Sequence, residues 1–207
     1  MTNMKSSQKY RITVILIAVN IAVYVYTSLA GGNFLETDIT MITKYGQMNG
    51  SILFLGWYYQ LFTSMFVHVT IVHLAGNMLF LLIFGLRAEE MFSLPEYLLI
   101  YFIGGLAGNL LSLGFLPLWV PSAGASGAIF GVFGACSVYI RRTVGQSIIG
   151  AVIFAFFLLL LSSGPNVNNL AHIGGLVIGL IFGYFLATRR KPEAVYNYNY
   201  SYSKTPF

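Results

Sequence analysis

The chain has 207 residues, of which 57% are hydrophobic and only 8% are charged. Soluble globular domains carry about 25% charged residues, so this composition excludes an ordinary soluble domain and indicates a membrane protein. The formal net charge of +5 comes from basic residues that flank apolar segments, so it gives no argument for nucleic-acid binding.

The apolar segments set the predicted architecture. A bilayer core about 30 Å thick needs about 20 apolar residues per helix. Six segments of that kind begin near Ile12, Phe66, Tyr97, Ser126, Ser147 and Leu170. The first is longer than the h-region of about 7–15 residues that is typical of a signal peptide, so we expect a mature helix there. The sequence predicts an all-α membrane protein with a six-transmembrane-helix bundle, as a single domain over residues 1–190.

Two stretches lie outside these segments. Residues 31–60, the outer loop, are longer than most connections, and such loops usually carry structure or function. The loop includes the aromatic run Trp57-Tyr58-Tyr59, and aromatic rings favour the headgroup level of a membrane. We therefore expect short interfacial helices in it. Residues 191–207 alternate tyrosine with asparagine and serine, which predicts a disordered cytoplasmic tail.

Basic residues mark one side of the bundle. They precede the first segment and follow the second, fourth and sixth, as Lys5, Lys9, Arg11, Arg87, Arg141, Arg142, Arg189, Arg190 and Lys191. With six spans all of them lie on one side, and lysine and arginine favour the cytoplasm. We therefore predict a multi-pass integral protein with both termini cytoplasmic. Its short termini suggest a prokaryotic cell membrane.

Three polar residues share one predicted depth. At 1.5 Å per helical residue, Ser126, His172 and His73 lie about 22, 26 and 21 Å from the basic residues that end their helices. The span that begins at Ser126 is about 24 Å long up to its arginines, shorter than a bilayer core of about 30 Å. Residues 116–125 are therefore expected to descend into a hydrated cavity that opens on the extracytoplasmic side.

These residue types suit acyl-transfer chemistry. A serine hydroxyl can attack a peptide carbonyl when a histidine accepts its proton. Ser126 starts a helix, where unpaired amides favour negative charge, so its backbone N–H is a candidate oxyanion donor. His73 and Asn77 are spaced by four on one helix face and supply further candidate donors. Small residues at the same spacing let membrane helices pack closely, which predicts that Ser126 and His172 meet; they are Gly127, Gly131, Gly175 and Gly179.

An acidic third member is not expected. Glu36 and Asp38 lie in the outer loop, whereas the remaining acids lie at the cytoplasmic side or in the tail. The sequence therefore favours a Ser-His dyad, with Phe130, one turn after the serine, as a packing surface for the imidazole. Three histidines without a neighbouring carboxylate or cysteine do not form a recognisable zinc set, so we expect neither a metal nor a cofactor. We expect His68 to be a rim or interfacial residue, without chemistry.

Three motifs together resemble the signature of rhomboid intramembrane serine proteases. They are His73-x-x-x-Asn77, Gly124-Ala125-Ser126-Gly127 and Ala171-His172-Ile173-Gly174-Gly175, in the family's order and on the corresponding helices. The resemblance implies a rhomboid-like bundle in which Ser126 cleaves transmembrane substrates and His172 is the base. It also implies an oxyanion hole formed by His73, Asn77 and the Ser126 amide, and a structural carboxylate at Glu89.

Two positions depart from the family pattern. Rhomboids often carry Trp-Arg in the outer loop where this chain has Tyr59-Gln60, and some bacterial members have a tyrosine where this chain has Phe130. The first departure bears on how the outer loop is anchored. The second keeps an aromatic ring and loses its hydroxyl.

Each signal alone has a simpler interpretation. A serine in a membrane helix often donates to a carbonyl one turn back, and a histidine can form a structural hydrogen bond between helices. The shared depth and spacing of these residues favour a catalytic function instead. We hypothesise an intramembrane serine endopeptidase whose partners are transmembrane protein substrates and membrane lipids. The alternatives are a catalytically inactive rhomboid-like protein that binds clients, and a small transporter or channel. The intact serine and histidine argue against the first, and the lack of an internal repeat argues against the second.

Overall fold

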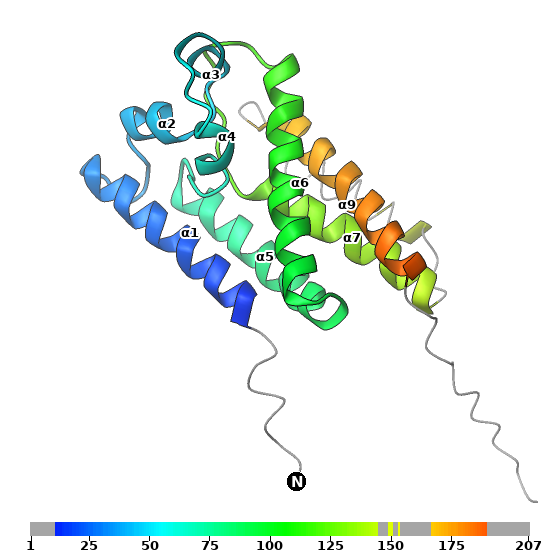
Figure 1. Cartoon of the computed structure of the whole chain (residues 1–207). Coiled ribbons are helices and arrows are strands. Elements are labelled where there is room, and N and C mark those ends of the chain that lie inside the picture. The colour runs from blue at the N-terminus through cyan, green and yellow to red at the C-terminus, as the bar shows by residue number, and fades with distance from the viewer. Residues whose placement is uncertain (1–10, 145–148, 151–152, 154–166, 190–207) are drawn as a thin grey trace, which may run out of the picture.

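Five long helices make up most of the described bundle (Figure 1). The computed structural model describes residues 11–144, 149–150, 153 and 167–189. The long helices are α1 (Arg11–Ala30), α5 (Ile71–Met91), α6 (Leu94–Phe115), α7 (Ser126–Val144) and α9 (Asn169–Arg189). By length and composition α1, α5, α6 and α9 are able to cross a membrane, and α7 has a shorter apolar stretch, Ser126–Arg141.

The predicted all-α class is confirmed for this part of the chain. The described residues form helices joined by turns, with two isolated β-bridges, Glu36–Thr70 and Gln47–Ser122. Five of the six predicted spans correspond to the long helices. Apart from 149–150 and 153, the predicted span that begins near Ser147 lies outside the described residues, as does the predicted tail.

Two helices begin elsewhere than the apolar pattern predicts. Helix α5 begins at Ile71 rather than near Phe66, because the Thr70 hydroxyl accepts the His73 amide at 3.1 Å and caps the helix there. Helix α6 begins at Leu94, before the predicted start, because Ser93 and Glu96 form a capping box. In both cases a local polar signal, not hydropathy, decides where the helix begins.

Glycines bring α7 and α9 side by side. A Cβ atom built on Gly175 would lie 1.9 Å from the Gly127 carbonyl oxygen, and one on Gly179 would lie 2.0 Å from that of Gly131. No side chain fits in such a gap, so the two backbones are in direct contact. Helix α6 packs against both α7 and α9. Its Gly104 faces Gly131 of α7, and a Cβ atom built on Gly104 would lie 3.2 Å from the Gly131 Cα.

Glu89 joins α5 to the start of α1. Its Oε1 accepts the backbone N–H of Thr13 at 2.7 Å, and the Thr13 hydroxyl lies 3.3 Å from the Tyr97 hydroxyl of α6. An amide in the first turn of a helix has no intrahelical acceptor and carries the positive end of the helix dipole. The carboxylate therefore stabilises the beginning of α1 and joins it to α5, and the Thr13 hydroxyl joins α1 to α6.

Replacing Glu89 by glutamine is expected to lower the stability of the bundle. A hydrogen bond to a charged group contributes about 1.5–3 kcal/mol, and the neutral amide loses its attraction for the α1 dipole. The measurement is the midpoint of thermal unfolding in detergent. Glu90→Gln is the matched control, because Glu90 forms an i,i+3 ion pair with the exposed Arg87, and such pairs contribute little. Equal midpoints for the two variants would contradict this function of Glu89.

The outer loop contains short helices, as predicted. They are α2 (Ile39–Tyr45), α3 (Asn49–Leu55) and α4 (Gln60–Thr63). Helix α4 begins at Gln60, the last residue of the outer loop. Gln60 is fully buried, and its side chain accepts the Met48 amide at 3.0 Å and donates to the Thr43 carbonyl at 2.8 Å. The loop thus keeps a polar anchor at the position where it departs from the family pattern. Large apolar side chains on its outside are exposed: Leu53, Phe54, Leu55, Tyr58 and Tyr59.

Candidate active site

A cavity of about 890 Å³ lies between α5, α7, α9 and the non-helical residues 116–125. Helix α6 ends at Phe115, and α7 begins only at Ser126, well below the end of α6 in Figure 1. Most residues of the intervening segment line the cavity. The segment therefore descends beside a pocket, as the shortness of the fourth predicted span indicates.

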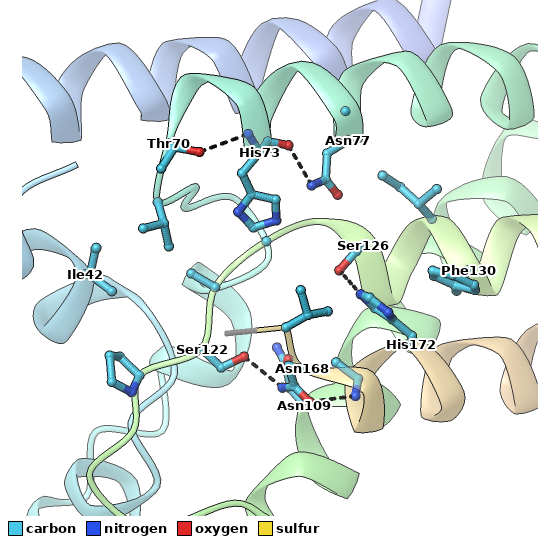
Figure 2. Close-up of a pocket in the computed structure, with 18 of the residues that line it drawn as sticks. Ile42, Thr70, His73, Asn77, Asn109, Ser122, Ser126, Phe130, Asn168 and His172 are labelled. Atoms are coloured by element: carbon cyan, nitrogen blue, oxygen red, sulfur yellow. Dashed lines mark hydrogen bonds between the residues drawn. The ribbon is translucent and has the colours of Figure 1, made fainter. Parts of the chain in front are cut away.

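Ser126 and His172 meet in this cavity. The Nε2 atom of His172 lies 2.8 Å from the Ser126 hydroxyl oxygen, and Figure 2 shows the two side chains pointing toward each other from α7 and α9. The histidine is only 3% exposed. At this distance a neutral imidazole with its proton on Nδ1 accepts the hydroxyl proton at Nε2. The arrangement therefore pairs a hydroxyl with a base in a sheltered pocket.

The Phe130 ring packs against the imidazole of His172. The two rings stack with centroids 4.6 Å apart and planes inclined by 18°. Among the described residues that line the cavity none is acidic. Packing against Phe130 thus contributes to the orientation of His172, and the missing tyrosine hydroxyl leaves the stack itself intact.

The α7–α9 contact extends up to the site. A Cβ atom on Gly127, the residue after the serine, would lie 3.2 Å from the Ala171 carbonyl oxygen, next to the histidine. Together with the contact of Gly175 against Gly127, this brings the two helices close on both sides of the dyad. The structure brings together the predicted glycine pairs and the two side chains that they were expected to join.

His73 and Asn77 face the same cavity from α5 (Figure 2). The Asn77 amide donates to the His73 carbonyl at 2.9 Å, one turn earlier. An asparagine amide has two hydrogens, so this bond uses one of them. The Ser126 amide is at the first position of its helix, where it has no intrahelical acceptor. All three groups predicted for the oxyanion hole therefore surround one pocket.

Gly124 gives the descending segment its close approach to α5. Its φ of +133° lies in a region that residues with a side chain rarely adopt. A Cβ atom there would also lie 2.9 Å from two atoms of the His73 ring, Cε1 and Nε2. Only glycine satisfies both conditions, which explains the glycine two residues before Ser126.

His68 is buried rather than at a rim or interfacial position, so that prediction is wrong. Its side chain is fully buried, its Nδ1 lies 3.2 Å from the Phe66 carbonyl oxygen, and its ring meets the His73 ring edge-on at 5.1 Å. The next residue is bonded to the outer loop, because the Thr37 amide donates to the Val69 carbonyl at 2.8 Å. The hydropathy of the residues around His68 does not indicate that Thr37, far away in the sequence, bonds to this segment.

Sequence reasoning missed Asn168, which lines the cavity beside Ser122 and Asn109. Its Oδ1 accepts the Ala171 amide at 2.9 Å, so it caps the helix that carries the histidine. A signal for this was present, because asparagine directly before an apolar helical segment is a favoured N-cap.

The comparisons with known proteins agree with the fold. A family model of the Rhomboid domain matches residues 55–189, a range that includes Ser126, His172, His73 and Asn77. This chain belongs to the rhomboid family. With four helices of membrane-crossing length among its described residues, this rhomboid is a multi-pass membrane protein.

Relatives of this rhomboid chain occur in bacteria, plants and a parasite. It is 35% identical over 179 residues to Rhomboid protease GluP of Bacillus subtilis (strain 168), which covers 81% of this chain and 33% of that protein. It is 37% identical over 134 residues to RHOMBOID-like protein 6, mitochondrial, of Arabidopsis thaliana, with coverages of 62% and 43%. It is 34% identical over 129 residues to Rhomboid-like protease 3 of Toxoplasma gondii, with coverages of 57% and 48%. The chain therefore matches less than half the length of each of these relatives.

Proposed function

We propose that this rhomboid chain is an intramembrane serine endopeptidase that hydrolyses a peptide bond in or next to a transmembrane helix of its substrate. The observation that carries the proposal is the 2.8 Å contact between Ser126 and His172 inside the cavity. Two of the relatives described above are named as proteases, which supports the same reaction class.

The geometry suits a two-step acyl transfer. Ser126 Oγ attacks the scissile carbonyl while His172 Nε2 takes its proton, and the C–N bond then breaks as the histidine returns that proton to the leaving amine. Water next gives a proton to His172 and attacks the acyl carbon; the bond from that carbon to Ser126 Oγ then breaks, His172 returns the proton to Oγ, and the new carboxyl terminus leaves. The Ser126 amide, Asn77 and His73 stabilise the negative oxygen formed in each step.

The membrane setting also favours a particular form of substrate. Backbone groups in a transmembrane helix already bond each other, so a substrate helix has to unwind before its carbonyl is exposed. Glycine or proline near the cut lowers the cost of that unwinding. We therefore propose transmembrane segments with a locally weak helix as substrates.

The orientation in the membrane belongs to the same proposal. Arg87, Arg141 and Arg189 lie toward the ends of α5, α7 and α9, whereas the dyad lies at the starts of α7 and α9. With the basic ends in the cytoplasm, both termini are cytoplasmic and the cavity opens to the extracytoplasmic side. The six-helix domain over residues 1–190 is part of this proposal as well.

Covalent labelling tests the proposal directly. An alkyl fluorophosphonate should react with the purified full chain in detergent, so that a bond forms between phosphorus and Ser126 Oγ while fluoride leaves. Peptide mapping by mass spectrometry should find the adduct on Ser126, and His172→Ala should prevent it because no base then activates the hydroxyl.

The control for labelling is Ser137→Ala. The Ser137 hydroxyl donates to the Phe133 carbonyl of its own helix at 2.8 Å, so this variant should label like the wild type. A client-binding protein or a transporter has no need of an activated serine. Labelling that is absent, or unchanged in Ser126→Ala, would therefore reject the protease function.

A further inference from the structure

Asn168 links the two chain segments that deliver the dyad. It precedes His172 by four residues, and its partner Ser122 precedes Ser126 by four residues. The Asn168 Nδ2 atom donates to the Ser122 hydroxyl oxygen at 2.8 Å (Figure 2). One hydrogen bond thus joins the approach to α7 with the approach to α9.

The Asn168 amide uses all of its hydrogen-bonding groups on this link. Its Oδ1 accepts the Ala171 N–H at 2.9 Å, and because a backbone amide only donates, this contact fixes which end is oxygen. The two Nδ2 hydrogens then point to the hydroxyls of Ser122 and Ser112, each at 2.8 Å. Ser112 in turn donates to the Gly108 carbonyl of α6 at 2.8 Å. A single side chain therefore connects α6, the first turn of α9 and the descending segment.

The far end of the link is held as well. The Ser122 amide donates to the Gln47 carbonyl at 2.8 Å, and the Gln47 amide donates back to the Ser122 carbonyl at 2.7 Å. Since Gln47 is buried in the outer loop, the segment before Ser126 is fixed on both sides. A shift of the α9 start relative to Ser122 has to break or stretch the Asn168 bond.

We propose that Asn168 is a positioning residue that keeps His172 in register with Ser126. The inference rests on the function proposed above. Proton transfer from the hydroxyl needs a separation of about 2.6–3.2 Å, and the two side chains come from different helices. By joining the chain four residues before each of them, Asn168 holds that separation while its own bonds go to Ala171, Ser122 and Ser112.

The test compares Asn168→Ala, Ser122→Ala and the double variant in the full chain. The readouts are the rate of Ser126 labelling by the fluorophosphonate, kcat and KM on a model transmembrane substrate, and the thermal midpoint. A misplacement of about 1 Å costs up to about 100-fold in rate, so Asn168→Ala should lower kcat and the labelling rate by about 10- to 100-fold. KM should stay within about twofold, because substrate binding does not use this bond.

The double variant shows whether the two residues act through one bond. If they do, adding Ser122→Ala to Asn168→Ala lowers kcat little further. Losses that multiply, or a KM that rises in step with the fall in kcat, would overturn the proposal. Should Asn168→Ala fail to fold, Ser122→Ala alone carries the test, because it removes one acceptor and leaves the α9 cap in place; a wild-type kcat for it would then overturn the proposal.

Two comparisons separate this inference from the function on which it rests. Asn33→Ala is the matched control, because Asn33 is exposed in the outer loop and accepts only the nearby Leu35 amide at 2.9 Å; it should behave like the wild type. Wild-type protein that is not labelled at Ser126 would overturn both proposals. Wild-type protein that is labelled, with Asn168→Ala labelled at the same rate, would overturn the positioning proposal alone.

Discussion

Replacing Ser126 by alanine is expected to abolish cleavage of a transmembrane substrate, with kcat falling by about 10⁴-fold or more. The variant keeps the cavity and the oxyanion donors, but it has no atom to form the acyl-enzyme. His172→Ala should cause a loss of similar size, because the hydroxyl then keeps its proton. The measurement is product formation from a purified substrate in detergent micelles, quantified as kcat.

The double variant adds a sharper criterion. Because the 2.8 Å contact makes Ser126 and His172 one chemical unit, removing both should cost about as much as removing either, since such losses are far from additive. Ser137→Ala, on the same helix as the serine, should retain full activity. Comparable product from the wild type and all the dyad variants would show that this pair does not catalyse the cleavage.

Gly175→Ala is expected to damage both stability and activity. Its new methyl group would lie 1.9 Å from the Gly127 carbonyl oxygen, whereas ordinary contact distances are about 3.5 Å. Helices α7 and α9 must therefore move apart, and overpacking of this kind costs about 1–3 kcal/mol or more. The same movement separates Ser126 from His172, so kcat should fall by about 100-fold.

Gly114→Ala is the matched control for the packing prediction. Gly114 lies in α6, and a Cβ atom there meets nothing within 4 Å. Alanine favours a helix over glycine by about 1 kcal/mol, so this variant should be as stable as the wild type or slightly more stable. The measurements are the midpoint of thermal unfolding and kcat for both variants. A Gly175→Ala protein with wild-type values would show that α7 and α9 do not depend on this contact.

Much of the site could be predicted because its residues carry short-range signals. Ser126 begins α7, as the non-helical break formed by residues 116–125 indicates. The spacing of four that joins His73 to Asn77 places both on one face of α5, and the same spacing in the glycines brings α7 to α9. These features depend on helical periodicity alone, which a single sequence displays directly.

The rest depends on partners far away in the chain. Carbonyls of α2 accept the amide of the buried Gln60, and the backbone next to the buried His68 is bonded to Thr37 of the outer loop. The asparagine amide that connects Ser112, Ser122 and the start of α9 joins residues more than forty positions apart. Gln60 and His68 look like surface residues in a sequence, because nothing local shows that they are buried, and the N-cap signal of Asn168 does not indicate its distant partners Ser112 and Ser122.

The hydrogen bonds that anchor the outer loop at Gln60 involve no charged side chain. Gln60 holds the loop through a neutral amide that accepts from Met48 and donates to Thr43. Dissolved ions weaken attractions between charges, whereas they have little to act on in bonds between uncharged groups. The packing of α4 against the rest of the outer loop should therefore depend little on the salt concentration.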